Sequence, residues 1–126
     1  MTYDSAWFHA VRRTCGPVFT AAGFTFNSAG PDPSGTQGFL LWEAEALDFA
    51  ARYPDSGIEE SYGPEQRPAR CIDYWTYLDR PGHARLCYEG WGFSDELVPL
   101  TGDPDADAAA LAAAWARILR VDQMPA

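Results

Sequence analysis

The residues with the clearest chemical potential are concentrated in one stretch of the chain, CIDYWTYLDRPGHARLCYEGWGF (71–93). It contains Cys71, His83 and Cys87 among acidic and aromatic side chains. Cysteine and histidine are the usual ligands of structural zinc, and a cysteine held beside a histidine is an activated nucleophile. Whether either chemistry is available depends on where the fold places these three side chains.

The segment RPGH (80–83) predicts a chain reversal, because proline and glycine favour tight turns. Aromatic and β-branched residues flank the reversal, so we expect it to join two antiparallel strands as a β-hairpin. In the simplest register, Asp79 pairs with Ala84 and Trp75 with Tyr88. This register fixes the distances between the cysteines and the histidine.

The predicted hairpin disperses the candidate ligands and nucleophiles. Cys71 and Cys87 lie on opposite sides of the sheet and about 16 Å apart at ~3.3 Å per residue, too far for a disulfide. His83 lies at the turn, about 13 Å along the strand from Cys87. His9 and Cys15 point away from each other on one helix. The sequence therefore predicts no metal site, no cofactor and no local catalytic pair, while a long-range pair such as Cys15 with His83 stays open.

One acidic residue, Asp73, shares the hairpin face that the predicted register turns toward the core. The other residues of this face are Cys71, Trp75, Tyr77, Ala84, Leu86 and Tyr88. Desolvation among aromatic rings would raise the pKa of the Asp73 carboxyl, which suits a general acid or base or a binding site for a cation. The alternative is an acid satisfied by an arginine or a backbone donor. The residues leave both interpretations open.

The chain begins and ends with predicted amphipathic helices. Apolar residues at three- and four-residue steps predict a helix over 5–22, capped by Asp4 or Ser5. We expect a kink or a break at Gly16-Pro17, because proline lacks the amide proton that a helix interior needs. A second helix follows Asp103, which is placed as an N-cap. Its predicted buried stripe consists of Ala108, Leu111, Ala112, Trp115, Ile118 and Leu119.

The middle of the chain predicts the remaining elements. We expect a short strand at 24–27, a strand at 38–43 and a short helix at 45–53, with one continuous helix as the alternative for 38–53. FSDELVPLTG (93–102) is interpreted as a connector. The predicted fold is a single α+β domain over 1–126. It has a small antiparallel β-sheet of about four strands, and the N-terminal and C-terminal helices pack on one of its faces.

Composition narrows the classes of partner. The formal net charge is −9, and all nine basic residues are arginine. A negative chain without a basic run is repelled by nucleic acid and by anionic membranes, and it favours a basic protein or a cationic small molecule. No segment has the length and apolarity of a membrane span, no signal peptide is visible, and the cysteine count is odd. We therefore expect a cytoplasmic protein.

Two functional hypotheses follow. The first, which the sequence favours over an enzyme, is a non-enzymatic binding domain of accessory or immunity type for a basic partner protein. The acidic loop DSGIEESYGPE (55–65) supports this hypothesis. The alternative is a small enzyme or ligand-binding domain with an aromatic-lined pocket, in which Asp73 acts as acid or base. The residues proposed to bind a ligand or partner are Asp73, Trp75, Tyr77, Tyr88, Glu59, Glu60 and Tyr62.

Overall fold

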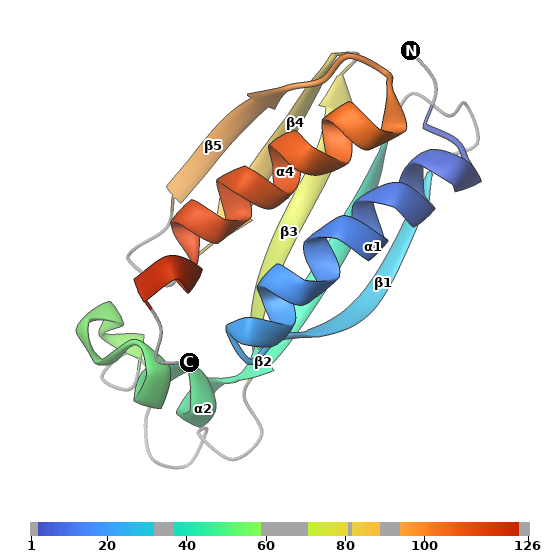
Figure 1. Ribbon diagram of the computed structural model, residues 1–126. Helices are drawn as coiled ribbons and strands as arrows, with labels where there is room; N and C mark the ends of the chain where they lie inside the picture. Colours follow the sequence, from blue (N-terminus) through green and yellow to red (C-terminus); the bar gives the residue numbers. More distant parts are fainter. Residues whose placement is uncertain (1–2, 32–36, 59–70, 81, 89–93, 124–126) are drawn as a thin grey trace.

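The computed structural model describes residues 3–31, 37–58, 71–80, 82–88 and 94–123 (Figure 1). Within these residues, three α-helices and five β-strands form an α+β fold, as the sequence predicts, with one strand more than expected. In chain order the elements are α1 (Ser5–Ala21), β1 (Thr25–Pro31), β2 (Gly38–Glu45), α2 (Ala46–Arg52), β3 (Cys71–Arg80), β4 (His83–Tyr88), β5 (Ser94–Pro99) and α4 (Pro104–Ile118).

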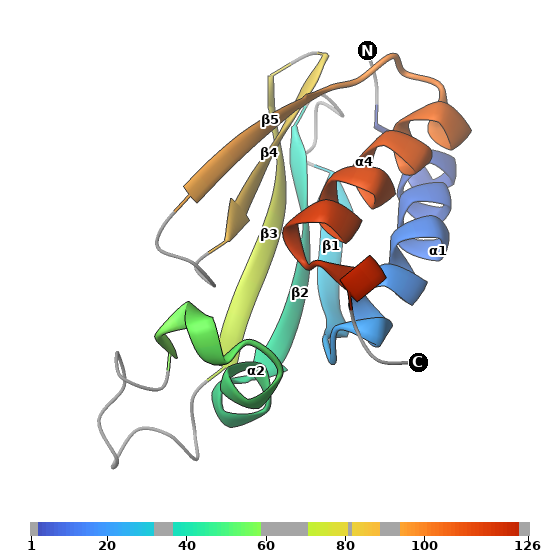
Figure 2. The same cartoon turned by 60° about the vertical axis from the view of Figure 1, so that its left-hand side comes forward.

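The strands form one sheet in the order β1-β2-β3-β4-β5, and every neighbouring pair is antiparallel. Helices α1 and α4 pack against each other and cover one face of this sheet, which confirms the predicted arrangement (Figures 1 and 2). In the part of the chain that the structure describes, no helix covers the opposite face (Figure 2). We call that opposite face, made of residues from β2 to β5, the open face.

The fifth strand, β5, lies in the segment that was interpreted as a connector. Buried and exposed side chains alternate along it, since Val98 is buried and Leu97 is half exposed, but its polar residues make this alternation hard to recognise in the sequence. β5 occurs because β4 offers it a free edge, and His83 to Tyr88 pair with Pro99 to Ser94 in unbroken register. Pairing of this kind depends on a neighbouring strand and leaves a weak trace in local composition.

Helix α1 is capped as predicted, because the Asp4 carboxylate accepts the Trp7 amide at 3.0 Å. Of the kink or break expected at Gly16-Pro17, the break does not occur, since Pro17 lies inside one continuous helix. Proline removes a single backbone donor there, and the buried side chains of Cys15 and Phe19 anchor the helix on both sides of it. Tertiary packing thus overrides the local preference.

The ambiguous central segment is a strand followed by a short helix, β2 and then α2, and the continuous-helix alternative is wrong. β2 pairs with a strand on each side, which fixes its extended conformation. α2 turns Phe49 into the end of the core, where its ring lies 5.9 Å from that of Phe24.

The core between the sheet and the two helices is filled by aromatic rings. Phe19 of α1 stacks on Trp42 of β2 at 4.4 Å, and Trp115 of α4 stacks on Tyr74 of β3 at 5.5 Å. The indole nitrogen of Trp115 donates to the buried Thr76 hydroxyl at 2.9 Å. The C-terminal helix is capped by Asp103 and buries the predicted stripe, although Ala112 is only partly buried.

Asp107 is a buried carboxylate at the start of α4. It accepts the Trp7 indole N–H at 2.9 Å, the Thr101 amide at 2.7 Å, the Thr101 hydroxyl at 3.0 Å and the Gly102 amide at 2.9 Å. These bonds join α1 to the loop that connects β5 with α4. Such complete satisfaction of a buried acid is characteristic of a structural role.

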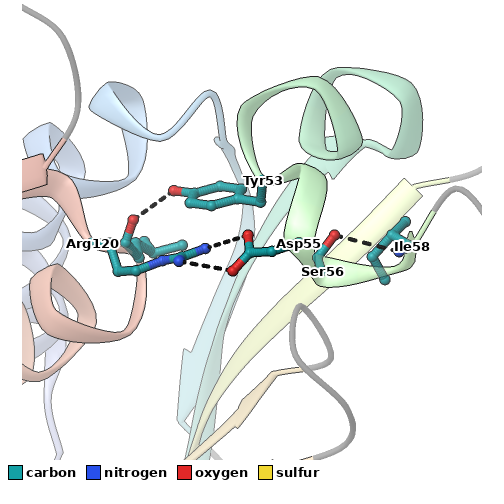
Figure 3. Close-up of polar contacts among 6 residues, drawn as sticks. Tyr53, Asp55, Ser56, Ile58 and Arg120 are labelled. Atoms are coloured by element: carbon teal, nitrogen blue, oxygen red, sulfur yellow. Dashed lines mark hydrogen bonds and ion pairs between the residues drawn. The ribbon is translucent and has the colours of Figure 1, made fainter.

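A second polar junction ties the end of α4 to the segment after α2 (Figure 3). The Arg120 guanidinium forms two parallel hydrogen bonds with the Asp55 carboxylate, both 3.0 Å long, and the Tyr53 hydroxyl donates to the Leu119 carbonyl at 2.7 Å. Arg120 has a φ of 53°, the left-handed conformation that often ends a helix. Its side chain therefore links the end of α4 to the segment after α2.

Candidate functional site

The β3–β4 hairpin differs from the prediction by one residue over most of its length. Arg80 pairs with His83, as the predicted turn requires, but Tyr77 pairs with Arg85 after a register shift between Tyr77 and Arg80. An irregularity of this kind places one extra residue in one strand. Trp75 is consequently opposite Cys87 and not opposite Tyr88.

Because side chains alternate along a strand, a slip of one residue exchanges the two faces of β3. The buried residues of β3 on the helix side are Tyr74, Thr76 and Leu78. Trp75 and Tyr77 therefore lie on the open face, and their predicted place in the core is wrong. The prediction for β4 is right, since Ala84 and Leu86 are fully buried.

The structure does not bring together the three aromatic residues proposed to line one pocket. Tyr88 stays on the helix side, with its ring 6.1 Å from Tyr74 and 6.1 Å from Trp115. Trp75 and Tyr77 lie on the other side of the sheet. The aromatic pocket of the enzyme hypothesis is therefore not formed by these residues.

Four further residues proposed for binding are placed only in part. Asp73 lies in β3 opposite Glu43, while its side chain is outside the described residues. Glu59, Glu60 and Tyr62 are also outside the described residues. The roles proposed for these four residues stay predictions.

The open face is built from two cross-strand rows, because residues paired directly across a ladder share a face. The first row runs from β2 to β5 through Phe39, Tyr77, Arg85 and Leu97. The second runs in parallel through Leu41, Trp75, Cys87 and Asp95. The residues within each row come from strands far apart in sequence, so only the sheet brings them together.

The rings on the open face form a connected aromatic surface. The Trp75 and Tyr77 rings are stacked 5.2 Å apart with planes within 1° of parallel, and the Phe39 ring lies 5.5 Å from Trp75. The Arg85 guanidinium lies 5.8 Å from the centre of the Tyr77 ring. Burial raises the pKa of Tyr77, as does the nearby Cys87, while Arg85 acts in the opposite direction. Flat rings of fixed orientation give a large contact area at little entropic cost.

Leu97 of β5 adds an aliphatic side chain to the open face and is 50% exposed. Two acidic residues lie on the same face. Glu43 is on it because it alternates with Phe39 and Leu41 along β2, and Asp95 is the last residue of the second row. The Cys87 thiol donates to the Asp95 carboxylate at 3.1 Å. The open face thus combines an apolar centre with carboxylates near its margins, a pattern typical of binding surfaces.

Sequence reasoning missed Phe39, Leu41, Arg85 and Leu97 as members of this surface. A signal was present in β2, where GFLLW carries apolar residues on both faces of the strand. A strand of an antiparallel sheet with one face in water normally alternates apolar and polar residues. The departure at Phe39 and Leu41 indicates that the second face also makes apolar contacts.

The cysteine and histidine chemistry considered first finds no support in the described geometry. Cys15 is buried in α1, and this burial raises the pKa of its thiol to about 12. Neither Cys15 nor Cys87 forms a disulfide in the part of the chain that the structure describes. No group of three or more His, Cys, Asp or Glu residues is positioned to hold a metal ion among the residues that the structure describes. Within the same residues, no helix has the length and apolarity to span a membrane.

Comparison of the chain with protein-family models, with curated proteins and with solved structures gave no match. The assignment of a function therefore depends on the geometry of the open face.

Proposed function

We propose that this chain is a non-enzymatic binding domain that docks a basic partner protein on the open face of its sheet. The observation that carries the proposal is the stacked pair of Trp75 and Tyr77, joined by Phe39, on a face without a covering helix in the described part of the chain. The ring contacts make this apolar surface contiguous, and contiguous apolar surface on a folded domain is a feature of interaction sites. Tryptophan and tyrosine are also the residues most enriched among those that dominate binding energy.

Charge supports a basic partner. The chain has a net charge of −9, and Glu43 and Asp95 lie on the open face itself. A negative field accelerates the encounter with a positive surface and disfavours an acidic one. The thiol state of Cys15 and Cys87, which form no disulfide among the described residues, supports the cytoplasm as the proposed compartment.

The proposal is tested by affinity capture from an extract of the source cells, with bound proteins identified and quantified by mass spectrometry. The bait is either the native chain or the double variant Trp75→Ala/Tyr77→Ala, whose fold is verified by circular dichroism. We expect the native chain to retain a protein of high isoelectric point, and the double variant to lose it. Retention should also fall as salt rises, because charges at the margin of an interface are screened.

Two outcomes would contradict the proposal. Equal capture of the basic protein by the native chain and the double variant would place the binding surface elsewhere. Self-association of the native chain in analytical ultracentrifugation, abolished by the double variant, would identify a second copy as the occupant of the open face. A second copy carries the same net charge of −9, so this result would remove the argument from charge.

A further inference from the structure

A hollow of about 250 Å³ lies between the first half of α1 and β1, at the edge of the helix-covered side of the sheet. Its lining includes Ser5, Phe8, His9 and Arg12 from the helix and Phe26 from the strand. The hollow lies beside α1, which covers the opposite side of the sheet, so it is separate from the open face described above. Its lining combines apolar rings with basic side chains, which is unusual in so acidic a chain.

Arg12 is the central residue of this hollow. Its guanidinium carbon lies 3.9 Å from the centre of the Phe26 ring, and Phe26 is held in turn by an edge-to-face contact with Trp42 at 4.9 Å. A guanidinium that stacks on a ring by its face keeps its N–H groups directed outward along its edge. The contact with the Phe26 ring thus limits the positions that the Arg12 guanidinium takes at the hollow.

Arg12 differs from the neighbouring Arg13 in its charged contacts. Arg13 forms an ion pair with Asp105 at 3.9 Å, whereas no carboxylate of the described residues pairs with Arg12. His9, one helical turn before Arg12, lines the same hollow, and no acidic residue does. In a chain of net charge −9, the lining of this hollow has one arginine and no acidic residue.

We propose that the hollow binds a small organic carboxylate with a flat apolar body. The carboxylate accepts the paired N–H donors of Arg12, and the apolar body packs against Phe8, which is 9% exposed, and the edge of Phe26. His9 and Ser5 offer further polar contacts at the rim. The volume is slightly below the range of about 300–1,000 Å³ for drug-sized ligands, which limits the ligand to about one ring.

Isothermal titration calorimetry with three probes tests the chemistry of this ligand. Benzoate has both the charge and the ring, acetate has the charge alone, and benzylammonium has the ring with the opposite charge. We expect benzoate to bind at least about tenfold more tightly than either of the other two, since a charge-assisted hydrogen-bond pair and the burial of a ring each exceed that factor. Equal binding of benzoate and acetate, or tighter binding of benzylammonium, would overturn the proposal.

The adjacent arginines provide a matched pair of variants for locating the site. Arg12→Gln should weaken benzoate binding about tenfold or more, while Arg13→Gln, which makes the same chemical change one residue along, should leave it within about twofold. Arg12→Lys keeps the charge and loses the forked geometry, so its affinity should fall between those of the native chain and Arg12→Gln. Both arginines are exposed, so these variants should fold normally. Equal effects at Arg12 and Arg13, or no effect at either, would overturn the proposal.

Discussion

Trp75 and Tyr77 lie two residues apart on β3, with rings 5.2 Å apart and parallel to within 1°, on the face of the sheet opposite the helices. Between them along the strand is Thr76, which is buried on the helix side and accepts a hydrogen bond from Trp115. Consecutive residues of one strand therefore serve two separate purposes. Tyr74, Thr76 and Leu78 hold the core together, and the residues that alternate with them form the open face.

This division predicts losses of stability of different size for two adjacent aromatic residues. Tyr74→Ala should lower the free energy of unfolding by about 3–5 kcal/mol, because Tyr74 is fully buried and stacks on Trp115. Trp75→Ala should lower it by only about 1 kcal/mol, since it removes contacts on a partly exposed face. Urea denaturation of both variants gives the two values. A larger loss at Trp75 than at Tyr74 would restore the face assignment that the sequence first indicated.

The buried carboxylate of Asp107 provides a second prediction. Asp107→Asn replaces an acceptor with an amide donor that faces the donors of Trp7, Thr101 and Gly102. Leaving such buried groups unpaired should lower the free energy of unfolding by about 2–4 kcal/mol. Asp105→Asn is the control, because Asp105 is exposed and its ion pair with Arg13 is 3.9 Å long. Its effect should stay within about 0.5 kcal/mol in thermal or urea unfolding. Equal effects of the two substitutions would contradict a structural role for Asp107.

The hydrogen bond between Trp115 and Thr76 is tested by a double-mutant cycle. Thr76→Val keeps the shape of the side chain but removes the acceptor of the Trp115 indole N–H, and should lower the free energy of unfolding by about 1–3 kcal/mol. In a Trp115→Phe background the donor is gone, so the same substitution should cost close to nothing. An unchanged penalty in that background would show that the hydrogen bond does not stabilise the fold.

Stability at alkaline pH should depend on Cys15. Burial raises the pKa of this thiol from 9.0 to about 12 in the folded chain. Above pH 9 the unfolded chain loses this proton while the folded chain keeps it, so stability falls as pH rises, by at most about 1.4 kcal/mol per pH unit. Cys15→Ala removes this contribution. Urea denaturation between pH 8 and 10.5 should therefore show a shallower decline for the variant, and parallel declines would contradict the raised pKa.

The helices and the general architecture were predictable because their signals are local. Asp4 and Asp103 are N-caps, and the apolar stripe at Leu111 and Trp115 has helical spacing. The passage through Pro17 was not predictable, since packing of Cys15 and Phe19 decides it.

The hairpin shows where sequence reasoning reached its limit. The turn was predicted in the right register, with Arg80 opposite His83. A register shift of one residue between Tyr77 and Arg80 exchanges the two faces of β3, and no residue type in this segment indicates the shift. Because the faces are exchanged, Trp75 and Tyr77 lie on the open face and not in the predicted pocket. The types of Trp75 and Tyr77 are enough to propose them for binding. The face of the sheet on which they lie depends on strand pairing, which the sequence of this segment does not determine.

The central claim is that the open face binds the partner, and two exposed leucines test it most directly. Leu97 lies on the open face and is 50% exposed, and Leu47 lies on α2 and is 42% exposed. The measurement is the Kd of the captured basic partner for Leu97→Ser and for Leu47→Ser, by calorimetry. We predict that Leu97→Ser raises the Kd about tenfold, as expected for loss of a buried leucine contact, and that Leu47→Ser leaves it within about twofold. Equal effects of the two substitutions, or a larger effect at Leu47, would contradict the account.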